Sequence, residues 1–169
     1  MPEEVYHNPA NDFVARFVGD PPMSFVDAGF AVQDDRCVFR IGDRGWILEL
    51  PYDFDVSKST IAAKCNVLRL GFRANQISLA SSMDPVHNVP VSVYLAEMQG
   101  HRNLITVKLD QDLIQVVTAP DERWKVGEHA WMSMVPDVMH VFADGQAIHH
   151  PELKLELPAS PITGGLAEI

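Results

Sequence analysis

The chain has 169 residues, 47% hydrophobic and 21% charged, a balance typical of a folded domain and not of a disordered segment. Its 13 basic and 23 acidic residues give a net charge of −10 without any cluster of lysine or arginine, so no nucleic-acid partner is expected. No apolar run approaches the roughly 20 residues of a membrane-spanning helix and no signal-peptide pattern is present, which predicts a soluble, intracellular protein.

The first predicted element is a short helix with both ends marked. Asn8 is a suitable N-cap, and Pro9 fits the first helical position, where a missing N–H costs nothing. Gly19 can adopt the left-handed conformation that closes the last turn. The pattern therefore predicts one helix that begins after Asn8 and ends before Gly19.

One face of this helix is apolar, with residues spaced i, i+1, i+4 and i+5, namely Phe13, Val14, Phe17 and Val18. A helix of about ten residues is marginally stable alone, so this face must pack against something. We expect an interface with a neighbouring domain or a second copy there, extended by Pro22 and Met23. In the isolated chain the face is expected to stay exposed, pairing two copies or remaining mobile, and not to be buried in the chain's own barrel.

The rest of the chain is predicted to form short strands separated by turn residues. Strands are expected over residues 23–32, 37–41, 46–50, 67–73, 89–98, 103–109, 113–117, 130–135, 139–142 and 146–148. A helical turn capped by Ser59 is expected within residues 57–66. Asp144 and Gly145 form a favourable two-residue hairpin turn. Strands this short and this regularly spaced indicate an all-β sandwich or small barrel.

The N-terminal stretch resembles a junction in the ATP-binding subunits of sugar-type ABC importers, the maltose and glycerol-phosphate group. At that junction a nucleotide-binding domain ends and a C-terminal regulatory domain begins. The matching segments follow one another in order and spacing: residues 2–6, 8–11, 13–19 and 21–23.

Three later segments are similar to blocks of the same family, in the family's order, so that the resemblance covers residues 2–148. Residues 70–76 keep a Gly-x-Arg centre, but Ala74-Asn75-Gln76 replaces the Pro-Glu-His that follows it in the family. The other two segments are 91–100 and 135–145. The family-motif positions are Gly71, Arg73, Gly100, Pro136, His140 and Phe142.

The resemblance implies an all-β fold of OB-like small barrels preceded by one short N-terminal helix. It implies three parts: a linker helix over residues 1–22 from the end of an ATPase domain, an OB-type regulatory domain over 23–150, and a C-terminal tail over 151–169. The function implied is regulation and dimerisation in ATP-driven import of a sugar, polyol or glycerol-phosphate-like solute.

The same resemblance implies the partners and the location. The partners would be the chain's own ATPase domain, a paired ATP-binding subunit and, indirectly, the membrane permeases. The location would be the cytoplasmic side of the inner membrane. The regulator of such a domain would be a phosphotransferase-system protein, a transcription factor or an anionic solute.

The motifs of ATP hydrolysis are absent from the sequence: the phosphate loop Gly-x-x-x-x-Gly-Lys-Ser/Thr, the signature Leu-Ser-Gly-Gly-Gln and an apolar strand ending in Asp-Glu. The chain alone is therefore not expected to hydrolyse ATP. No catalytic, cofactor-binding or metal-binding residue is predicted, and ATP and magnesium are expected only in a full-length parent. That parent is the preferred interpretation, with Met1 added to its C-terminal piece; a naturally detached module is the alternative.

Other polar groups have plainer explanations than catalysis. Adjacent His149 and His150 point to opposite faces of a strand, so a metal site with His140 is not expected, and His140 is predicted to be structural. Solvated charge is expected at Asp53 and Asp55. The serines at 57, 59, 81 and 82 have no neighbouring histidine with an orienting acid in sequence, although such triads assemble in space. Reduced, half-buried thiols are expected at Cys37 and Cys65.

Two alternative functions remain open. One is a stand-alone OB-type module that binds an oxyanion or another small solute. The other is an OB-type nucleic-acid binder, which would stack bases on exposed rings. The candidate rings are Trp46, Trp124, Trp131, Tyr52 and Tyr94, of which Trp46 and Trp131 are predicted to lie in the core and Trp124 to be exposed. The net charge of −10 disfavours the second alternative.

Overall fold

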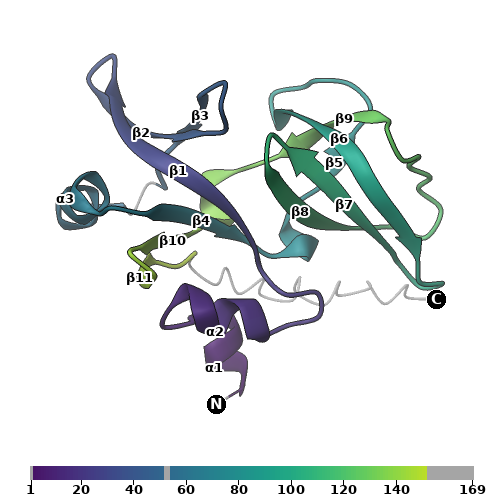
Figure 1. Ribbon diagram of the computed structural model, residues 1–169, viewed down its shortest axis with the longest axis horizontal. Coiled ribbons are helices and arrows are strands. Elements are labelled where there is room, and N and C mark those ends of the chain that lie inside the picture. Colours follow the sequence, from purple (N-terminus) through teal and green to yellow (C-terminus); the bar gives the residue numbers. More distant parts are fainter. Residues whose placement is uncertain (1, 52–53, 152–169) are drawn as a thin grey trace, which may run out of the picture.

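The computed structural model of the chain describes residues 2–51 and 54–151. Over this part the chain is built mainly from antiparallel strands, with two short helices beneath them and a third helix at one side (Figure 1). The helices are α1 (Pro2–His7), α2 (Asp12–Phe17) and α3 (Val56–Lys64), and the two short 3₁₀ turns are η1 (Ala74–Gln76) and η2 (Pro136–Val138). This confirms the predicted all-β class.

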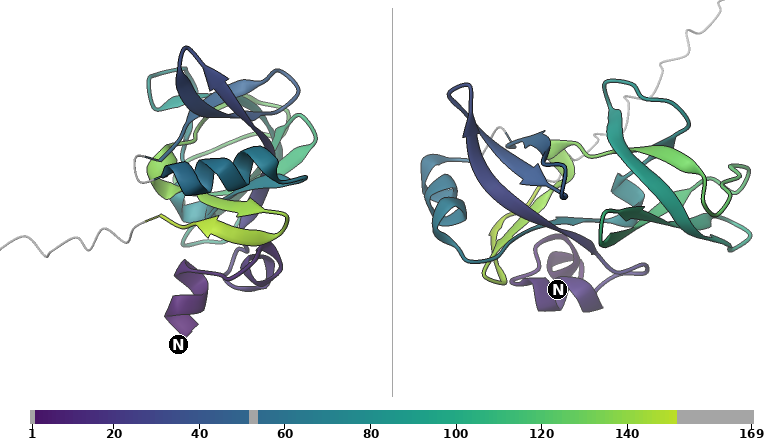
Figure 2. Two further views of the ribbon diagram at one scale, coloured as in Figure 1. Left: turned by 90° about the vertical axis from the view of Figure 1, so that its left-hand side faces the viewer. Right: turned by 45° about the horizontal axis from the view of Figure 1, so that its top comes forward.

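The strands form two antiparallel sheets. The first sheet contains, in spatial order, β11 (Gln146–His149), β10 (His140–Ala143), β4 (Leu68–Phe72), β1 (Ser24–Gln33), β2 (Arg36–Ile41) and β3 (Trp46–Glu49). The second contains β5 (Leu79–Ala80), β9 (His129–Ser133), β6 (His87–Met98), β7 (Asn103–Leu109) and β8 (Asp112–Thr118). Each sheet coils on itself, and the two lie side by side with α1 and α2 below the first (Figure 2).

One hydrophobic core joins the two sheets. Phe39 and Leu70 of the first sheet and Val107 and Ile114 of the second belong to the same cluster of buried side chains. Along β8 the buried residues alternate with exposed or half-buried ones, as expected where one sheet face is covered, whereas β7 is buried at every position except Lys108. A further link is the Ser24 hydroxyl on β1, which accepts the Gln115 N–H of β8 at 2.9 Å.

The hairpin turns follow the sequence. Asp144 and Gly145 have φ values of 48° and 82° and join β10 to β11, as predicted. Asp34 and Asp35, with φ values of 49° and 61°, form the same kind of turn between β1 and β2. Asparagine, aspartate and glycine tolerate this backbone region better than other residues do, so the turn chemistry fixes where the strands pair.

The N-terminal helical region differs from the prediction, because it forms two helices and the N-cap of the second is Asn11 and not Asn8. The Asn11 side chain accepts the Val14 N–H at 2.8 Å. Asn11 has an extended backbone and also forms an isolated bridge with Gln146 of β11. This tertiary contact, which the sequence does not display, decides between the two asparagines. Gly19 has the predicted positive φ, 110°.

Three smaller predictions also need correction. Helix α3 begins after Asp55, whose carboxylate caps it by accepting the Lys58 N–H, so Ser59 is not the cap. Trp124 is half-buried against the core and not exposed. Cys37 is exposed, while Cys65 is half-buried as expected. The predictions for Tyr52, Asp53 and residues 152–169 lie outside the described residues.

Candidate functional site

The N-terminal helices dock on the outer face of the first sheet. Ala15 of α2 is fully buried and packs with Met23 and Phe142 in a small cluster separate from the main core. The backbone adds two hydrogen bonds, from the Asp12 N–H to the Gly145 carbonyl at 2.9 Å and from the Ala147 N–H to the Ala10 carbonyl at 3.1 Å. The helices are therefore part of the folded unit.

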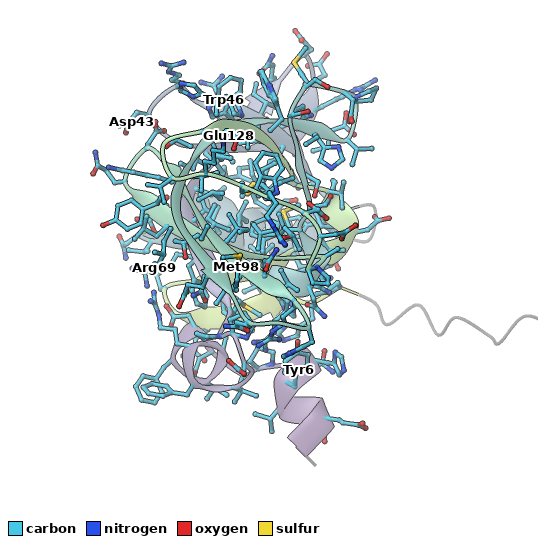
Figure 3. The ribbon with its side chains drawn as sticks, turned by 90° about the vertical axis from the view of Figure 1, so that its right-hand side faces the viewer. Tyr6, Asp43, Trp46, Arg69, Met98 and Glu128 are labelled. Carbon is cyan, nitrogen blue, oxygen red and sulfur yellow. The ribbon has the colours of Figure 1, made fainter. Side chains whose placement is uncertain are left out.

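Arg73 is the main polar contact of this docking. Its side chain is buried, and its guanidinium donates to the Val18 carbonyl and to the Tyr6 carbonyl, each at 2.5 Å. The guanidinium also lies 4.1 Å from the centre of the Tyr6 ring. Tyr6 sits where α1 meets the strands (Figure 3). One side chain thus fixes both ends of the segment from residue 6 to residue 18.

Because Arg73 is buried, the stability of its charged form depends on its contacts with Tyr6 and Val18. Loss of hydration lowers the pKa of Arg73, since burial disfavours the charged form. Two carbonyl oxygens and an aromatic face replace part of the lost water, while the buried Nε has no hydrogen-bond partner among the described residues. Without them the charge would be buried and uncompensated, which costs several kcal/mol, on the order of 3–5.

Gly71 allows the segment that follows α2 to approach the first sheet closely. A Cβ at this position would overlap the Met23 sulfur and would lie 3.0 Å from Phe142 Cε2. Both neighbours belong to the small cluster with Ala15. The glycine of the Gly-x-Arg segment therefore has a packing role here, while Arg73, two residues later, makes the polar contact.

A substitution at Gly71 tests this role. We expect Gly71→Ala to lower the free energy of unfolding by about 1 kcal/mol, because the Met23 thioether must move and Phe142 restricts where it can go. Chemical unfolding monitored by circular dichroism measures the change. The added substitution Met23→Ala should make Gly71→Ala less costly than it is alone. Equal costs in both backgrounds would contradict the packing account.

Two histidines lie beside the arginine. His140 of β10 is directly opposite Gly71 of β4 in the sheet register and is buried. Its Nδ1 lies 2.9 Å from Nδ1 of His150, so one of the two nitrogens must donate and the other accept. Burial, and then the proximity of His150 and Arg73, lowers the pKa of His140 to about 3. His140 is therefore neutral near pH 7, in the structural role that the sequence predicted.

The predicted interface residues divide into exposed and buried ones. Phe13 and Phe17 are 66% and 73% exposed, and their rings contact each other along α2 with centroids 4.7 Å apart and planes tilted by 51°. Pro22 is also exposed, whereas Val14 and Val18 are half-buried. Met23 is buried in the small cluster, so it does not lie on the surface where the interface was predicted. The exposed apolar surface is therefore formed chiefly by the two phenylalanines.

Four of the six family-motif positions converge at the docking site, namely Gly71, Arg73, His140 and Phe142. The other two have local roles in turns. Gly100, with φ 82°, lies in the hairpin between β6 and β7, and Pro136 begins η2. The sequence did not reveal Tyr6, Ala15 or His150 as contributors, because their partners are distant in sequence. The arginine of the Gly-x-Arg segment was the one sequence feature that pointed to this site. Its partners could not be predicted, because they are backbone carbonyls, which every residue type carries.

The described part of the chain has neither a cluster of metal-ligating side chains nor a membrane-spanning helix. Within residues 2–51 and 54–151, no group of three or more His, Cys, Asp or Glu side chains is arranged to hold a metal ion. The His149 ring contacts Phe54, and the ring of His150, which follows the last residue of β11, contacts His140. No described helix is both long and apolar enough to cross a bilayer.

Comparisons with known proteins agree on one family. Residues 70–142 match the TOBE domain family. The sn-glycerol-3-phosphate import ATP-binding protein UgpC of Vibrio vulnificus is 32% identical over 120 residues, covering 68% of this chain and 28% of that protein. UgpC of Salmonella typhimurium is 31% identical over 145 residues, covering 86% of this chain and 37% of that protein. The chain thus spans about a third of the length of these relatives.

Among solved structures, the cytoplasmic molybdate-binding protein ModG with molybdate bound is similar to this chain. The TM-score is 0.54 at 12% sequence identity, and the match covers 72% of this chain and 94% of ModG. At this identity the similarity supports the OB-like fold alone.

Proposed function

Because the chain contains a TOBE domain, we propose that it is the regulatory and dimerisation domain of the ATP-binding subunit of an ABC importer. Its relatives are ATP-binding subunits of the sugar- and glycerol-phosphate-type importers, in which such a domain lies at the C-terminus. It would take part in ATP-driven import of a sugar, polyol or glycerol-phosphate-like solute. ATP and magnesium would bind to the ATPase part of the parent protein and not to this chain.

The observation that carries the proposal is the exposed pair Phe13 and Phe17 on a helix that is itself fixed to the barrel. Two neighbouring aromatic rings, each more than half exposed, are unusual on a surface that has no partner. Because Arg73 and Ala15 hold the helical region in place, the rings are presented in one orientation. A preformed apolar surface loses little conformational entropy when a partner covers it.

The partner proposed for this surface is the chain's own ATPase domain or the paired subunit, with the permeases contacted indirectly. The parent complex would lie at the cytoplasmic side of the inner membrane. The domain would act by binding more favourably to one arrangement of the ATPase domains than to another, since only such a difference shifts a conformational equilibrium.

The size of the native polypeptide tests the assignment to a larger subunit. An antibody raised against the chain should detect, in cells of the source organism, a polypeptide clearly longer than 169 residues. Peptide mapping of that polypeptide should reveal a phosphate loop and an importer signature sequence. Detection of a native protein of only 169 residues would overturn the parent-subunit proposal.

The exposed pair is tested separately by sedimentation of the chain as it stands. We expect concentration-dependent dimerisation that the double substitution Phe13→Asp, Phe17→Asp weakens at least about 10-fold, because it places two charges on the apolar surface. The matched control is Val32→Asp, which changes a residue 64% exposed near the end of β1. If the double variant and the control self-associate equally, the two rings are not the interface.

A further inference from the structure

A serine, a histidine and an aspartate are brought together on the second sheet. Strand β9 lies between β5 and β6, and Ser133 of β9 is the register partner of His87 of β6. On its other side, the Ser133 N–H donates to the carbonyl of Ser78, which immediately precedes β5. Because Ser133 is small, the side chains of Ser78 and His87 meet across it.

The hydrogen bonds form a continuous chain. Ser78 Oγ lies 2.8 Å from His87 Nε2, and His87 Nδ1 lies 2.9 Å from Asp84 Oδ2. Both distances fall within the range of about 2.6–3.2 Å that joins a nucleophile to its base and the base to an orienting acid. This is the arrangement of a Ser-His-Asp triad, which is recognised by geometry and not by order in the chain.

The aspartate is itself held in place. Its Oδ1 accepts the Val86 N–H at 2.8 Å and the His87 N–H at 2.7 Å, so the carboxylate is fixed in a tight turn. The bond from the His87 backbone, and then the bond from its side chain, lower the pKa of Asp84. An ionised carboxylate at Nδ1 keeps the proton on that nitrogen, which leaves Nε2 free to accept the Ser78 proton.

Ser133 positions the nucleophile. Its buried hydroxyl accepts the Ser78 N–H at 2.8 Å and lies 3.1 Å from Ser78 Oγ. The Ser78 residue is exposed, and the side chains of His87 and Asp84 are 19% and 45% exposed. A small molecule can therefore reach the hydroxyl from solvent while the base remains partly shielded.

We propose that Ser78, His87 and Asp84 form a nucleophilic site that accepts acyl groups from small activated esters. An exposed site stabilises a developing oxyanion less than a dry one does. Esters with good leaving groups, such as aryl esters and thioesters, are therefore the suitable substrates. This activity is separate from the proposed role in import.

The chemical steps follow from the hydrogen bonds. Ser78 Oγ attacks the acyl carbon and its proton passes to His87 Nε2, so that an oxygen–carbon bond forms. The bond to the leaving group breaks, and the leaving oxygen or sulfur takes the proton from His87. A water molecule then attacks the acyl-serine, gives its proton through His87 to Ser78 Oγ, and releases the carboxylic acid.

The test uses the whole chain with p-nitrophenyl acetate and, in parallel, a fluorophosphonate probe. We expect acetylation and phosphonylation mapped to Ser78, with acetylation at that residue about 100-fold faster than at other serines, the lower range of general-base assistance. His87→Gln should slow labelling of Ser78 about 100-fold, because it removes the base. Asp84→Asn should slow it at least about 10-fold, because it removes the acid that orients His87. The matched controls, Ser81→Ala and Ser82→Ala, change exposed serines in the loop between β5 and β6 that carries Asp84, and should leave the rate unchanged.

The labelled residues are mapped on the wild-type chain, so a folding defect in a variant cannot affect this result. Labels distributed over several serines and lysines, without preference for Ser78, would overturn the proposal. Equally fast labelling of Ser78 in the wild-type chain and in a folded His87→Gln variant, with folding judged by the urea midpoint, would overturn it as well.

Discussion

Replacing Arg73 with methionine is expected to lower the free energy of unfolding by about 3 kcal/mol, the cost of removing two hydrogen bonds from a charged donor and leaving their acceptors unpaired. Methionine keeps much of the aliphatic volume against the Tyr6 ring, so the change removes mainly the contacts to the Tyr6 and Val18 carbonyls. Urea unfolding gives the energy. Hydrogen exchange should show that amides of α1 and α2 lose protection before those of the sheets.

The matched control is Arg16→Met. Arg16 lies on the same helical region, with its guanidinium 4.5 Å from the centre of the Phe25 ring, but it is exposed. An exposed cation–π contact contributes about 0.5–1 kcal/mol. If Arg16→Met cost as much as Arg73→Met, or if exchange at α1 and α2 were unchanged by Arg73→Met, the account of Arg73 as the principal docking contact would be wrong.

The second large expected effect is a loss of folding stability at acid pH. Stability should fall by about 2 kcal/mol between pH 7 and pH 5 through His140, whose pKa is about 3 in the folded chain and about 6.5 when unfolded. Below its unfolded pKa the unfolded chain binds a proton that the folded chain refuses. The contribution of His140 to the free energy of unfolding is therefore fully present above the unfolded-state pKa. It is lost progressively as the pH falls toward the pKa of the folded chain.

The groups that face His140 all act in the same direction. His150, Arg73, His149 and His7 each disfavour a positive charge on His140, after the larger effect of burial. The pKa of His150 is also lowered, chiefly by burial, which adds to the loss in the same window. The carboxylates with lowered pKa values, Asp55 and Asp84, titrate at lower pH and do not contribute there.

The substitution His140→Asn tests this explanation, because its amide can replace Nδ1 as a hydrogen-bond partner of His150 without titrating. Urea unfolding at pH 5, 6 and 7 should show a flatter dependence on pH than in the wild-type chain. His101→Asn, at an exposed turn, is the control and should keep the wild-type slope. An unchanged slope in His140→Asn would show that other groups carry the acid sensitivity.

The strands could be predicted from the sequence because their signals are local. The strand predicted over residues 103–109 has the bounds of β7, since apolar alternation and flanking turn residues mark both ends. Strand β5 was missed because two residues are too short for any periodic pattern. The N-cap of α2 was predicted wrongly for a different reason. A bridge to Gln146, more than 130 residues away in sequence, selects Asn11 and not Asn8.

The candidate site was only partly predictable for the same reason. The motif positions Gly71, Arg73, His140 and Phe142 were recognisable, but their role at the docked helices depends on contacts with backbone carbonyls and on residue 23. The serines at 81 and 82 were considered as nucleophiles from the sequence, whereas the serine that lies within hydrogen-bond distance of a histidine is Ser78. Sheet register, which places Ser133 opposite His87, is what selects it.

The double attachment made by Arg73 has a mechanical consequence. Since one guanidinium holds the carbonyls of both Tyr6 and Val18, the segment between them is a closed loop anchored at its base. A pull or twist applied ahead of residue 2 reaches the barrel through this anchor before it can unwind α2. Helix α2 lies inside this loop and is held to the barrel at both ends, so a polypeptide joined ahead of α1 would be connected to the barrel through the Arg73 contact.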